Sequence, residues 1–521
     1  MSFFHGLFPV LARGGQRSGL ALCSLLALCA CGGGGSSSAP APVVPPPAAV
    51  VAQPLELQDS LPGTGATAVD PALTDLTLSH LGFSDLQLRV SGPCSVTQVV
   101  RRRLESLSTA AFSELLDHKL RCSGLETNAS VEVTLDGQRD NGDAYTAQLT
   151  FGTGVGSVAQ IVELDAVLSP RATVDSLFDT YLANALLPEL DLRAATEALI
   201  GGALSLLVDD AWTQLTDTTA LFGAGSRRVS YPSRDPLGNA ADRLTGLVAA
   251  PDTSSAFVPR DQVIVLAHST GSTPGDLDPT NAWYVLANVL AAQGYLVVAA
   301  DNWGRGDTAD AAETYLMANR TAANSLDFLQ AVLADSRYAD FVATSGPTAV
   351  TIVGYSQGGH SAMALWQLLA TQGPDNLVVR DVFAGGAPHN LFRTFKGVLE
   401  QVDGRCNDDD YCRNVDPDAT VSFATRRILP GFLSYTDTGL VESEVIDGDA
   451  LAPAFVTSFL EQESRLDPLK ILLQQNSFTN LVDPLAVFGD DGARLFLYHA
   501  PRDRLVPAAN TVELEALLGP V

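Results

Sequence analysis

Residues 348–366 read TAVTIVGYSQGGHSAMALW, and this stretch decides the fold of the larger part of the chain. A β-branched run leads into a Gly-x-Ser-x-Gly pentad at 354–358, and a helix-forming run follows it. Glycine at 354 and 358 permits a turn so tight that any side chain there would collide with the neighbouring strand or helix. The pattern predicts a strand–turn–helix that holds Ser356 at a helix N-terminus, where backbone amides can stabilise an oxyanion.

Outward from this turn, strands and helices alternate. Strands are predicted over 262–267, 295–300, 378–384 and 494–499, and helices over 281–293 and 311–334. Such alternation predicts a mostly parallel sheet joined by right-handed crossovers. Residues 390–480 separate the last two strands and contain helical runs, so we expect a helical cap over the sheet edge.

Residues 227–521 resemble the α/β-hydrolases, and within them the secretory-lipase-like esterases of bacteria and fungi. The resemblance depends on segments 229–248, 268–271, 301–306, 354–359 and 499–507. It implies an α/β-hydrolase fold with Ser356 as the nucleophile and Asp503, in an Asp-x-x-Val-Pro context, as the acid of the catalytic triad. The oxyanion hole would use the backbone N–H groups of Gln357 and of Thr270, with Ser269 as second choice for the latter. His268 is interpreted as a structural residue of its turn. No metal or organic cofactor is implied.

The sequence lacks a histidine at the position where the general base of the triad is expected. The superfamily places this histidine roughly 25 to 40 residues beyond the acid, whereas 521 − 503 leaves 18 residues after Asp503, none of them histidine. Three explanations stay open: the chain is a fragment or is shortened by a frameshift, another histidine serves, or the protein is inactive. Candidate substitutes are His360, His389 and His499, and none is assigned.

The N-terminus has the features of an export signal. Arg13 and Arg17 precede a short apolar run at 20–28, and Leu-Cys-Ala-Cys-Gly follows at 28–32. This resembles a bacterial lipobox with Cys31 as the lipidated first residue of the mature protein, so residues 1–31 are interpreted as a lipoprotein-type signal peptide. Residues 32–54, rich in Gly, Ser, Pro and Ala, would be a tether. The expected location is the bacterial outer membrane or cell surface, reached through the lipid anchor, or otherwise the periplasm or the medium.

The remaining cysteines agree with export. Cys94 and Cys122 form one expected disulfide pair, and Cys406 and Cys412 form another that closes a short loop. Their spacing does not suit a metal site. The formal charge of −28 argues against nucleic acid as a partner.

Residues 55–154 are predicted to form a small β domain. Alternating runs at 76–78, 86–90, 130–135 and 144–151 predict strands, although 101–120 has a more helical pattern. Segments 62–70 and 131–154 resemble the first and last strands of bacterial Ig-like domains. Residues 155–224 are interpreted as a helical connector, and 225–521 as the hydrolase domain, which looks truncated at its C-terminus.

The sequence therefore predicts an exported serine hydrolase that cleaves carboxylic esters or lipids through an acyl-enzyme. A peptidase or a polyester depolymerase would use the same triad. The rival hypothesis is a non-catalytic surface-binding protein with a decayed hydrolase domain.

Overall fold

The computed structural model describes most of the chain from Ala66 onward. The described residues are 66–69, 77–81, 83–92, 94–108, 114–122, 130–139, 144–153, 161–181, 220–237, 240–252, 260, 262–407, 409–413, 415–489 and 492–519. The predicted signal peptide, its Cys31, the tether and residues 182–219 of the predicted connector all lie outside these residues.

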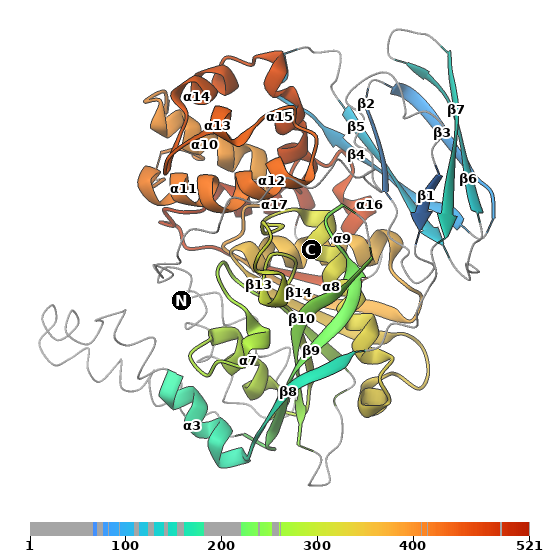
Figure 1. The fold of residues 1–521 in the computed structure, drawn as a ribbon, viewed down its shortest axis with the longest axis vertical. Coiled ribbons are helices and arrows are strands. Elements are labelled where there is room, and N and C mark those ends of the chain that lie inside the picture. Colours follow the sequence, from blue (N-terminus) through green and yellow to red (C-terminus); the bar gives the residue numbers. More distant parts are fainter. Residues whose placement is uncertain are drawn as a thin grey trace, which may run out of the picture.

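A large eight-stranded sheet organises the molecule (Figure 1). Its strand order is β17-β14-β13-β11-β12-β10-β9-β8. Strands β12, β11, β13, β14 and β17 run parallel, whereas β10, β9 and β8 join antiparallel at one edge. The bounds are β8 (Val162–Ser169), β9 (Ala224–Arg234), β10 (Ala240–Pro251), β11 (Gln262–Ala267), β12 (Leu296–Ala300), β13 (Thr348–Tyr355), β14 (Leu377–Gly385) and β17 (Arg494–Tyr498).

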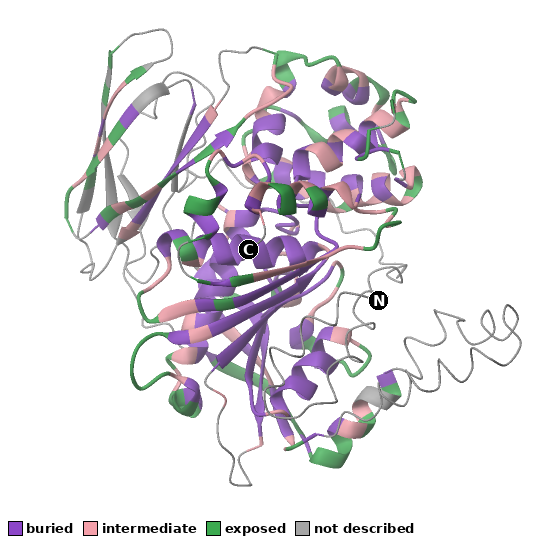
Figure 2. Ribbon diagram, turned by 180° about the vertical axis from the view of Figure 1, so that it is seen from behind, coloured by how far each residue is buried: buried purple, intermediate pink, exposed green. Residues whose placement is uncertain are grey.

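Helices cover both faces of this sheet, and the central strands are buried (Figure 2). One face packs α8 (Ala318–Leu333), α9 (Gln357–Gln372), α16 (Pro484–Phe488) and α17 (Ala509–Leu518). The other face packs α7 (Ala282–Ala291) and α3 (Arg171–Tyr181). Both faces are apolar because parallel strands between two helical layers have no solvent-facing side. The short helices are η2 (Pro274–Asp276), η3 (Gly306–Thr308), η4 (Ser336–Phe341) and η6 (Ser464–Leu466).

This arrangement is the α/β-hydrolase fold, and it confirms the predicted fold class. The order of the parallel strands and the turn between β13 and α9 are the features that define it. The predicted strands at 262–267, 295–300, 378–384 and 494–499 correspond to β11, β12, β14 and β17.

The predicted cap is present as a helical layer between β14 and β17. It contains α10 (Leu391–Val402), α11 (Pro417–Phe423), the π-helix η5 (Ala424–Ile428), α12 (Leu429–Tyr435), α13 (Glu442–Val445), the short strands β15 (Ile446–Asp447) and β16 (Ala450–Leu451), α14 (Pro453–Leu460) and α15 (Asp467–Gln475). It has an apolar core of its own, which includes Phe392, Phe432 and Phe459 together with Tyr315 and Leu316 of the sheet domain. The expected Cys406–Cys412 disulfide closes a loop of this cap.

The small N-terminal domain is all β and lies beside the cap (Figure 1). Its described strands form a four-stranded sheet, β1-β7-β6-β3, and a three-stranded sheet, β2-β5-β4. The bounds are β1 (Ala66–Val69), β2 (Thr77–Leu81), β3 (Phe83–Val90), β4 (Cys94–Arg103), β5 (Glu114–Cys122), β6 (Ser130–Arg139) and β7 (Ala144–Thr153). Cys94 is disulfide-bonded and stands opposite Cys122 in the register of β4 and β5.

This β domain is joined to the hydrolase domain by backbone hydrogen bonds. Arg103 N donates to Asn480 O, and Val482 N donates to Arg101 O, each at 2.8 to 2.9 Å. Between these two bonds the side chain of Arg102 is buried. Its Nε lies 3.3 Å from Asp117 Oδ2, and its Nη2 donates to Gln367 Oε1 of α9, also at 3.3 Å. The domain therefore contacts α9, the elbow helix that begins directly after Ser356.

Two sequence interpretations differ from the structure. Of the connector predicted as helical over 155–224, the described residues contain helix α3 but also β8, an edge strand of the large sheet that pairs antiparallel with β9. The helical pattern of 101–120 is wrong where it overlaps the end of β4, at Arg103, and β5, from Glu114, since these strands pair antiparallel. Tertiary pairing overrides the helix propensity of Leu and Glu there.

The long helix predicted over 311–334 begins only at Ala318. Before it, residues 309–317 are irregular, and Leu316 has a positive φ of 58°. Side chains of this segment contact the cap and the turn after β11, and these contacts compete with the helix.

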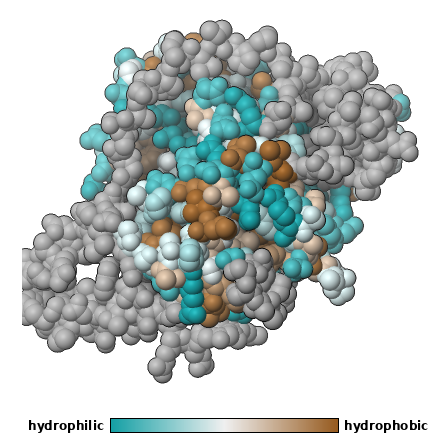
Figure 3. All heavy atoms as spheres, turned by 60° about the horizontal axis from the view of Figure 1, so that its bottom comes forward, coloured by the Kyte–Doolittle hydropathy of each residue, from teal (hydrophilic) through white to brown (hydrophobic). Residues whose placement is uncertain are grey.

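On the face that Figure 3 shows, brown atoms form small groups among teal ones. Exposed apolar side chains cluster on the edge strand β8: Val162, Leu164, Val167 and Leu168. Among the described residues, no helix combines the length and the hydropathy that a membrane span requires.

We predict that Arg102→Met destabilises the protein by about 3–5 kcal/mol, because it removes the guanidinium that is ion-paired with the buried Asp117 carboxylate. The matched control is Arg101→Met, since Arg101 pairs with Glu114 at the exposed surface, where an ion pair contributes about 0–1 kcal/mol. Urea unfolding measures both. Equal losses for the two variants would contradict the role given to Arg102.

Candidate active site

Ser356 lies at the sharp turn between β13 and α9. Its backbone has φ 56° and ψ −121°, a conformation that L-residues rarely adopt. Its N–H donates to Gly385 O at 2.7 Å, which ties the turn to β14. Such strain persists only where the surroundings enforce it, and it is frequent at functional sites.

The two glycines of the pentad explain why the turn can form. A Cβ at Gly354 would collide with the carbonyl of Gly358, and a Cβ at Gly358 would collide with the carbonyl of Ala267 on β11. Helix α9 therefore begins in backbone contact with two strands. This places Ser356 at the carboxyl edge of the sheet, as the sequence predicted.

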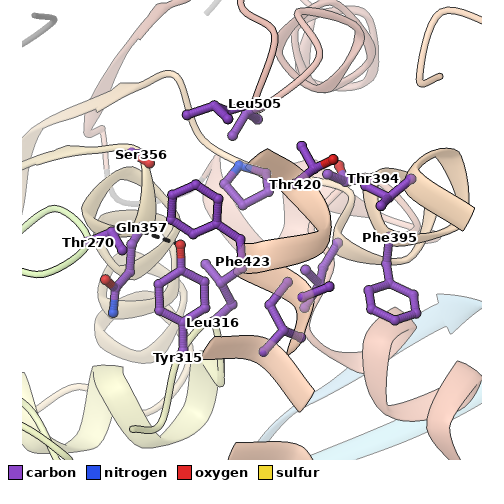
Figure 4. Close-up of a pocket in the computed structure, with 16 residues that line it drawn as sticks. Thr270, Tyr315, Leu316, Ser356, Gln357, Thr394, Phe395, Thr420, Phe423 and Leu505 are labelled. Carbon is purple, nitrogen blue, oxygen red and sulfur yellow. Dashed lines mark hydrogen bonds between the residues drawn. The ribbon is translucent and has the colours of Figure 1, made fainter. Parts of the chain in front are cut away.

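Ser356 lines a mostly apolar pocket between the sheet edge and the cap (Figure 4). The pocket encloses about 680 Å³ outside the protein atoms, a volume that includes open solvent. Its lining residues are Thr270, Tyr315, Leu316, Ser356, Gln357, Pro388, Leu391, Thr394, Phe395, Val398, Thr420, Phe423, Ala424, Ile428, Leu505 and Val506. The cap supplies about half of them, so it shapes the space in front of the serine.

The two expected oxyanion-hole residues, Thr270 and Gln357, meet Ser356 in this pocket. Thr270 lies in the turn after β11, and its hydroxyl is 2.8 Å from Tyr315 Oη. Burial raises the pKa of Tyr315, so the phenol stays protonated at neutral pH. The second choice, Ser269, is buried instead, and its hydroxyl accepts from Trp283 Nε1 at 2.9 Å.

His268 holds the turn after β11. Its ring nitrogens lie 3.0 Å from the carbonyl oxygens of Ser269 and Asp301. Asp301 itself is buried, accepting from Thr245 Oγ1 at 2.6 Å and from Gly275 N at 2.8 Å. Its burial raises its pKa. These contacts fit the structural role expected of His268.

Asp503 lies in the loop after β17. Its Oδ1 accepts from the N–H groups of Leu505 and Val506 at 2.9 and 3.0 Å, and both of these residues line the pocket. Its Oδ2 is 3.7 Å from His499 Nε2. The carboxylate thus shapes the rim of the pocket and faces one histidine.

Of the three histidines that could substitute for the base, two are hydrogen-bonded to other residues and the third is fully buried. His499 Nδ1 is 2.7 Å from Thr511 Oγ1, and its Nε2 is 2.8 Å from Val506 O. His360 Nε2 is 2.8 Å from Asn476 O. His389 is fully buried, and neither of its ring nitrogens has a hydrogen-bond partner among the described residues. No hydrogen bond joins Ser356 Oγ to a histidine ring within the described part of the chain.

Burial keeps these histidines neutral. It lowers the pKa of His499, lowers that of His360 to about 4, and lowers that of His389 well below its usual value. A neutral imidazole is the form that a general base requires, but none of the three rings is hydrogen-bonded to Ser356 among the described residues.

Sequence reasoning missed Glu313 and Tyr315. Glu313 is buried and accepts from the side-chain amide of Gln357, the residue after the nucleophile, at 2.7 Å. Both residues lie in the segment predicted as helix, and no motif marks them. No group of three or more His, Cys, Asp or Glu side chains suited to a metal ion occurs among the described residues.

Comparisons with known proteins give structural neighbours only. No protein-family profile and no curated protein matches the chain. The chain is similar to a proposed hydrolase from Legionella pneumophila, with 17% identity, a TM-score of 0.47, and 68% of this chain and 88% of that chain covered. It is also similar to the rice cell wall degrading esterase LipA from Xanthomonas oryzae, with 17% identity, a TM-score of 0.43, and coverage of 70% and 86%.

A third neighbour is a proposed hydrolase from Agrobacterium vitis, with 14% identity, a TM-score of 0.29, and coverage of 56% and 85%. These neighbours are hydrolases by name. The strand order and the turn at Ser356 define the α/β-hydrolase fold of this chain on their own.

We predict that stability falls as the pH is lowered from about 6.5 towards 4. The folded state holds the pKa of His360 at about 4, whereas the unfolded chain binds this proton near pH 6.5, so between these values the unfolded state carries more protons. His360→Gln, which retains an N–H donor, should reduce the slope by up to about 1.4 kcal/mol per pH unit. Urea unfolding at several pH values measures this. A slope that the substitution does not change would contradict the burial of a neutral His360.

Proposed function

We propose that the protein is a serine hydrolase that cleaves carboxylic esters through an acyl-enzyme on Ser356. The observation that carries the proposal is the backbone of Ser356, with φ 56° and ψ −121°, at a glycine-flanked turn that opens into an apolar pocket. A strained serine between a strand and a helix N-terminus is the arrangement that exposes its hydroxyl to a bound acyl group.

In this mechanism Ser356 Oγ attacks the carbonyl carbon of the ester, and a base receives its proton. The negative charge that forms on the carbonyl oxygen is stabilised by the N–H groups of Gln357 and Thr270. The base returns this proton to the leaving oxygen as the C–O bond of the ester breaks, and the alcohol departs. Water then gives a proton to the base and attacks the acyl carbon, and the bond to Ser356 Oγ breaks as the serine is reprotonated. Asp503 is the proposed acid of the triad. The base is unassigned, since no described histidine ring is bonded to Ser356.

The chemistry of the pocket favours an ester with an apolar acyl or alkyl group. The apolar lining includes Leu316, Leu391, Phe395, Phe423 and Ile428, and the polar lining includes hydroxyls of threonine and tyrosine. Such a lining suits a hydrocarbon chain. It does not suit a charged peptide, because burying a charge without a partner is costly.

An ester is also favoured over an amide by the chemistry of the leaving group. An amine must be protonated as it leaves, and this requires a general acid. An activated ester releases a weakly basic alcohol and depends less on that step. The peptidase therefore ranks below the esterase, whereas a polyester depolymerase, which also releases an alcohol, stays open.

The rival reading, a non-catalytic surface-binding protein with a decayed hydrolase domain, is favoured by one observation. This is the absence of a hydrogen bond from Ser356 to any histidine in the described residues. Measurement of Ser356-dependent hydrolysis separates the two proposals.

Export and lipid anchoring at Cys31 are part of the proposal and are supported by residues 13–32 alone. The Ig-like character of the β domain likewise stays a prediction from sequence resemblance. Mass spectrometry of the mature N-terminus tests the anchor, because an unmodified N-terminus after Cys31 would contradict it.

We predict weak but Ser356-dependent hydrolysis of p-nitrophenyl butyrate by this chain. Without an aligned base, solvent must accept the proton of Ser356, so the attack is slow and kcat/KM should lie below about 10⁴ M⁻¹s⁻¹. Ser356→Ala should lower the rate further, to at most the acceleration of about 10³–10⁴ over water that the oxyanion hole and binding alone supply. Ser325→Ala, at a buried serine of the neighbouring helix α8, is the control. A rate that Ser356→Ala leaves unchanged would contradict the proposed nucleophile.

We predict that Phe423→Ala weakens the preference for long acyl chains. Phe423 lines the pocket from the cap, and loss of its contact with the chain should cost about 1–3 kcal/mol. With p-nitrophenyl octanoate, kcat/KM should fall about tenfold or more, and with the acetate it should change little. Val441→Ala, at an exposed apolar residue of the cap, is the control. An equal change for both esters would show that the acyl group lies elsewhere.

A further inference from the structure

Glu313 is a buried carboxylate that contacts three separate parts of the molecule. Its side chain is 5% exposed. One oxygen, Oε1, accepts from Gln357 Nε2 at 2.7 Å. The other, Oε2, lies 3.1 Å from Arg305 Nη2 and 3.2 Å from Arg427 Nη1.

These partners come from different elements. Gln357 is the first residue of the elbow helix α9, Arg305 follows β12, and Arg427 lies on the π-helix η5 of the cap. A buried carboxylate is stable only if its charge is paired and its oxygens are bonded. Because Arg427 supplies part of that pairing, the position of the cap and the position of Gln357 depend on the same side chain.

The backbone around Glu313 also contacts helix α12 of the cap. Gly431 of α12 packs against the carbonyl of Glu313 so closely that a Cβ there would collide with it. Tyr435 Oη, at the end of α12, donates to Ala312 O at 2.7 Å and accepts from Trp303 Nε1 at 3.0 Å. Helix α12 is therefore docked directly on the irregular segment.

The same segment also reaches the second oxyanion-hole residue. Tyr315 Oη is 2.8 Å from Thr270 Oγ1, as the dashed line in Figure 4 marks. Tyr315 and Leu316 belong to the apolar core of the cap and also line the pocket. Two side chains, Glu313 and Tyr315, thus hold the residues that would donate the two oxyanion N–H groups.

We propose that Glu313 is a positioning residue that couples the docking of the cap to the geometry of the oxyanion hole. The ion pair with Arg427 holds the carboxylate in place, and the carboxylate holds the side chain of Gln357, whose N–H lies next to the nucleophile. The inference rests on the proposed function for its catalytic consequence, and on the contacts of Glu313 for the coupling itself. A loosened cap should therefore loosen the start of α9.

The test uses Arg427→Gln and Glu313→Gln in the full chain, with Arg426→Gln as the matched control. Arg426 lies beside Arg427 on η5 but pairs with the exposed Asp449. Hydrogen–deuterium exchange of the peptide that covers residues 356–363 reads the coupling without requiring activity. Both substitutions are in the cap. Arg427→Gln should nevertheless increase exchange at residues 356–363, whereas Arg426→Gln should leave it unchanged. Exchange at 356–363 that is the same in both variants overturns the inference.

Hydrolysis of p-nitrophenyl butyrate gives the catalytic readout. Glu313→Gln and Arg427→Gln should lower kcat by about tenfold or more and leave KM within about twofold, because oxyanion donors act mainly in the transition state. The double variant should lose less than the product of the two single losses, since both changes break one network. A loss confined to KM, or independent losses, would contradict the coupling.

The two proposals fail separately. If no Ser356-dependent hydrolysis occurs, the proposed function is wrong, and the exchange experiment still decides whether the cap is coupled to the elbow. Glu313→Gln could unfold the protein, but Arg427→Gln keeps the Glu313–Arg305 pair, so its exchange pattern decides the matter in either case.

Discussion

The close approach of helix α9 to strands β11 and β13 is the constraint on which the rest of the structure depends. No side chain fits at Gly354 or Gly358, because each Cβ would meet a backbone carbonyl. Because both positions are glycine, the chain can turn sharply at Ser356, and the serine has a φ of 56°. The strain is maintained by the packing of α9, which is buried along almost its whole length.

The other two parts of the molecule are built onto this helix. The β domain reaches it through Arg102, which contacts Gln367, and through Gln372, which donates to Leu120 O at 2.8 Å. The cap reaches it through Glu313 and Gln357. Polar contacts from both sides therefore meet on the element that positions Ser356, and this explains why a chain with three distinct regions folds around one site.

The sequence predicts the elements that carry short-range signals and misses those that depend on distant contacts. The pentad predicts the turn because glycine is the only residue that fits at Gly354 and Gly358, and alternating strands and helices predict the parallel sheet. Edge strand β8 was missed because its exposed face gives no burial pattern. Glu313 and Tyr315 were missed because their roles arise from partners more than forty residues away in sequence, and nothing local marks those partners. The base could not be assigned from sequence, and in the described structure no histidine ring bonds Ser356.

The central claim is that the turn at residues 354–358 makes Ser356 the reactive nucleophile of the chain. The most direct measurement is reaction with a fluorophosphonate probe, followed by mass-spectrometric mapping of the labelled peptide. The account predicts slow labelling at Ser356 alone, abolished by Ser356→Ala and retained in Ser325→Ala. Labelling of a different residue, or labelling that persists in Ser356→Ala, would contradict it.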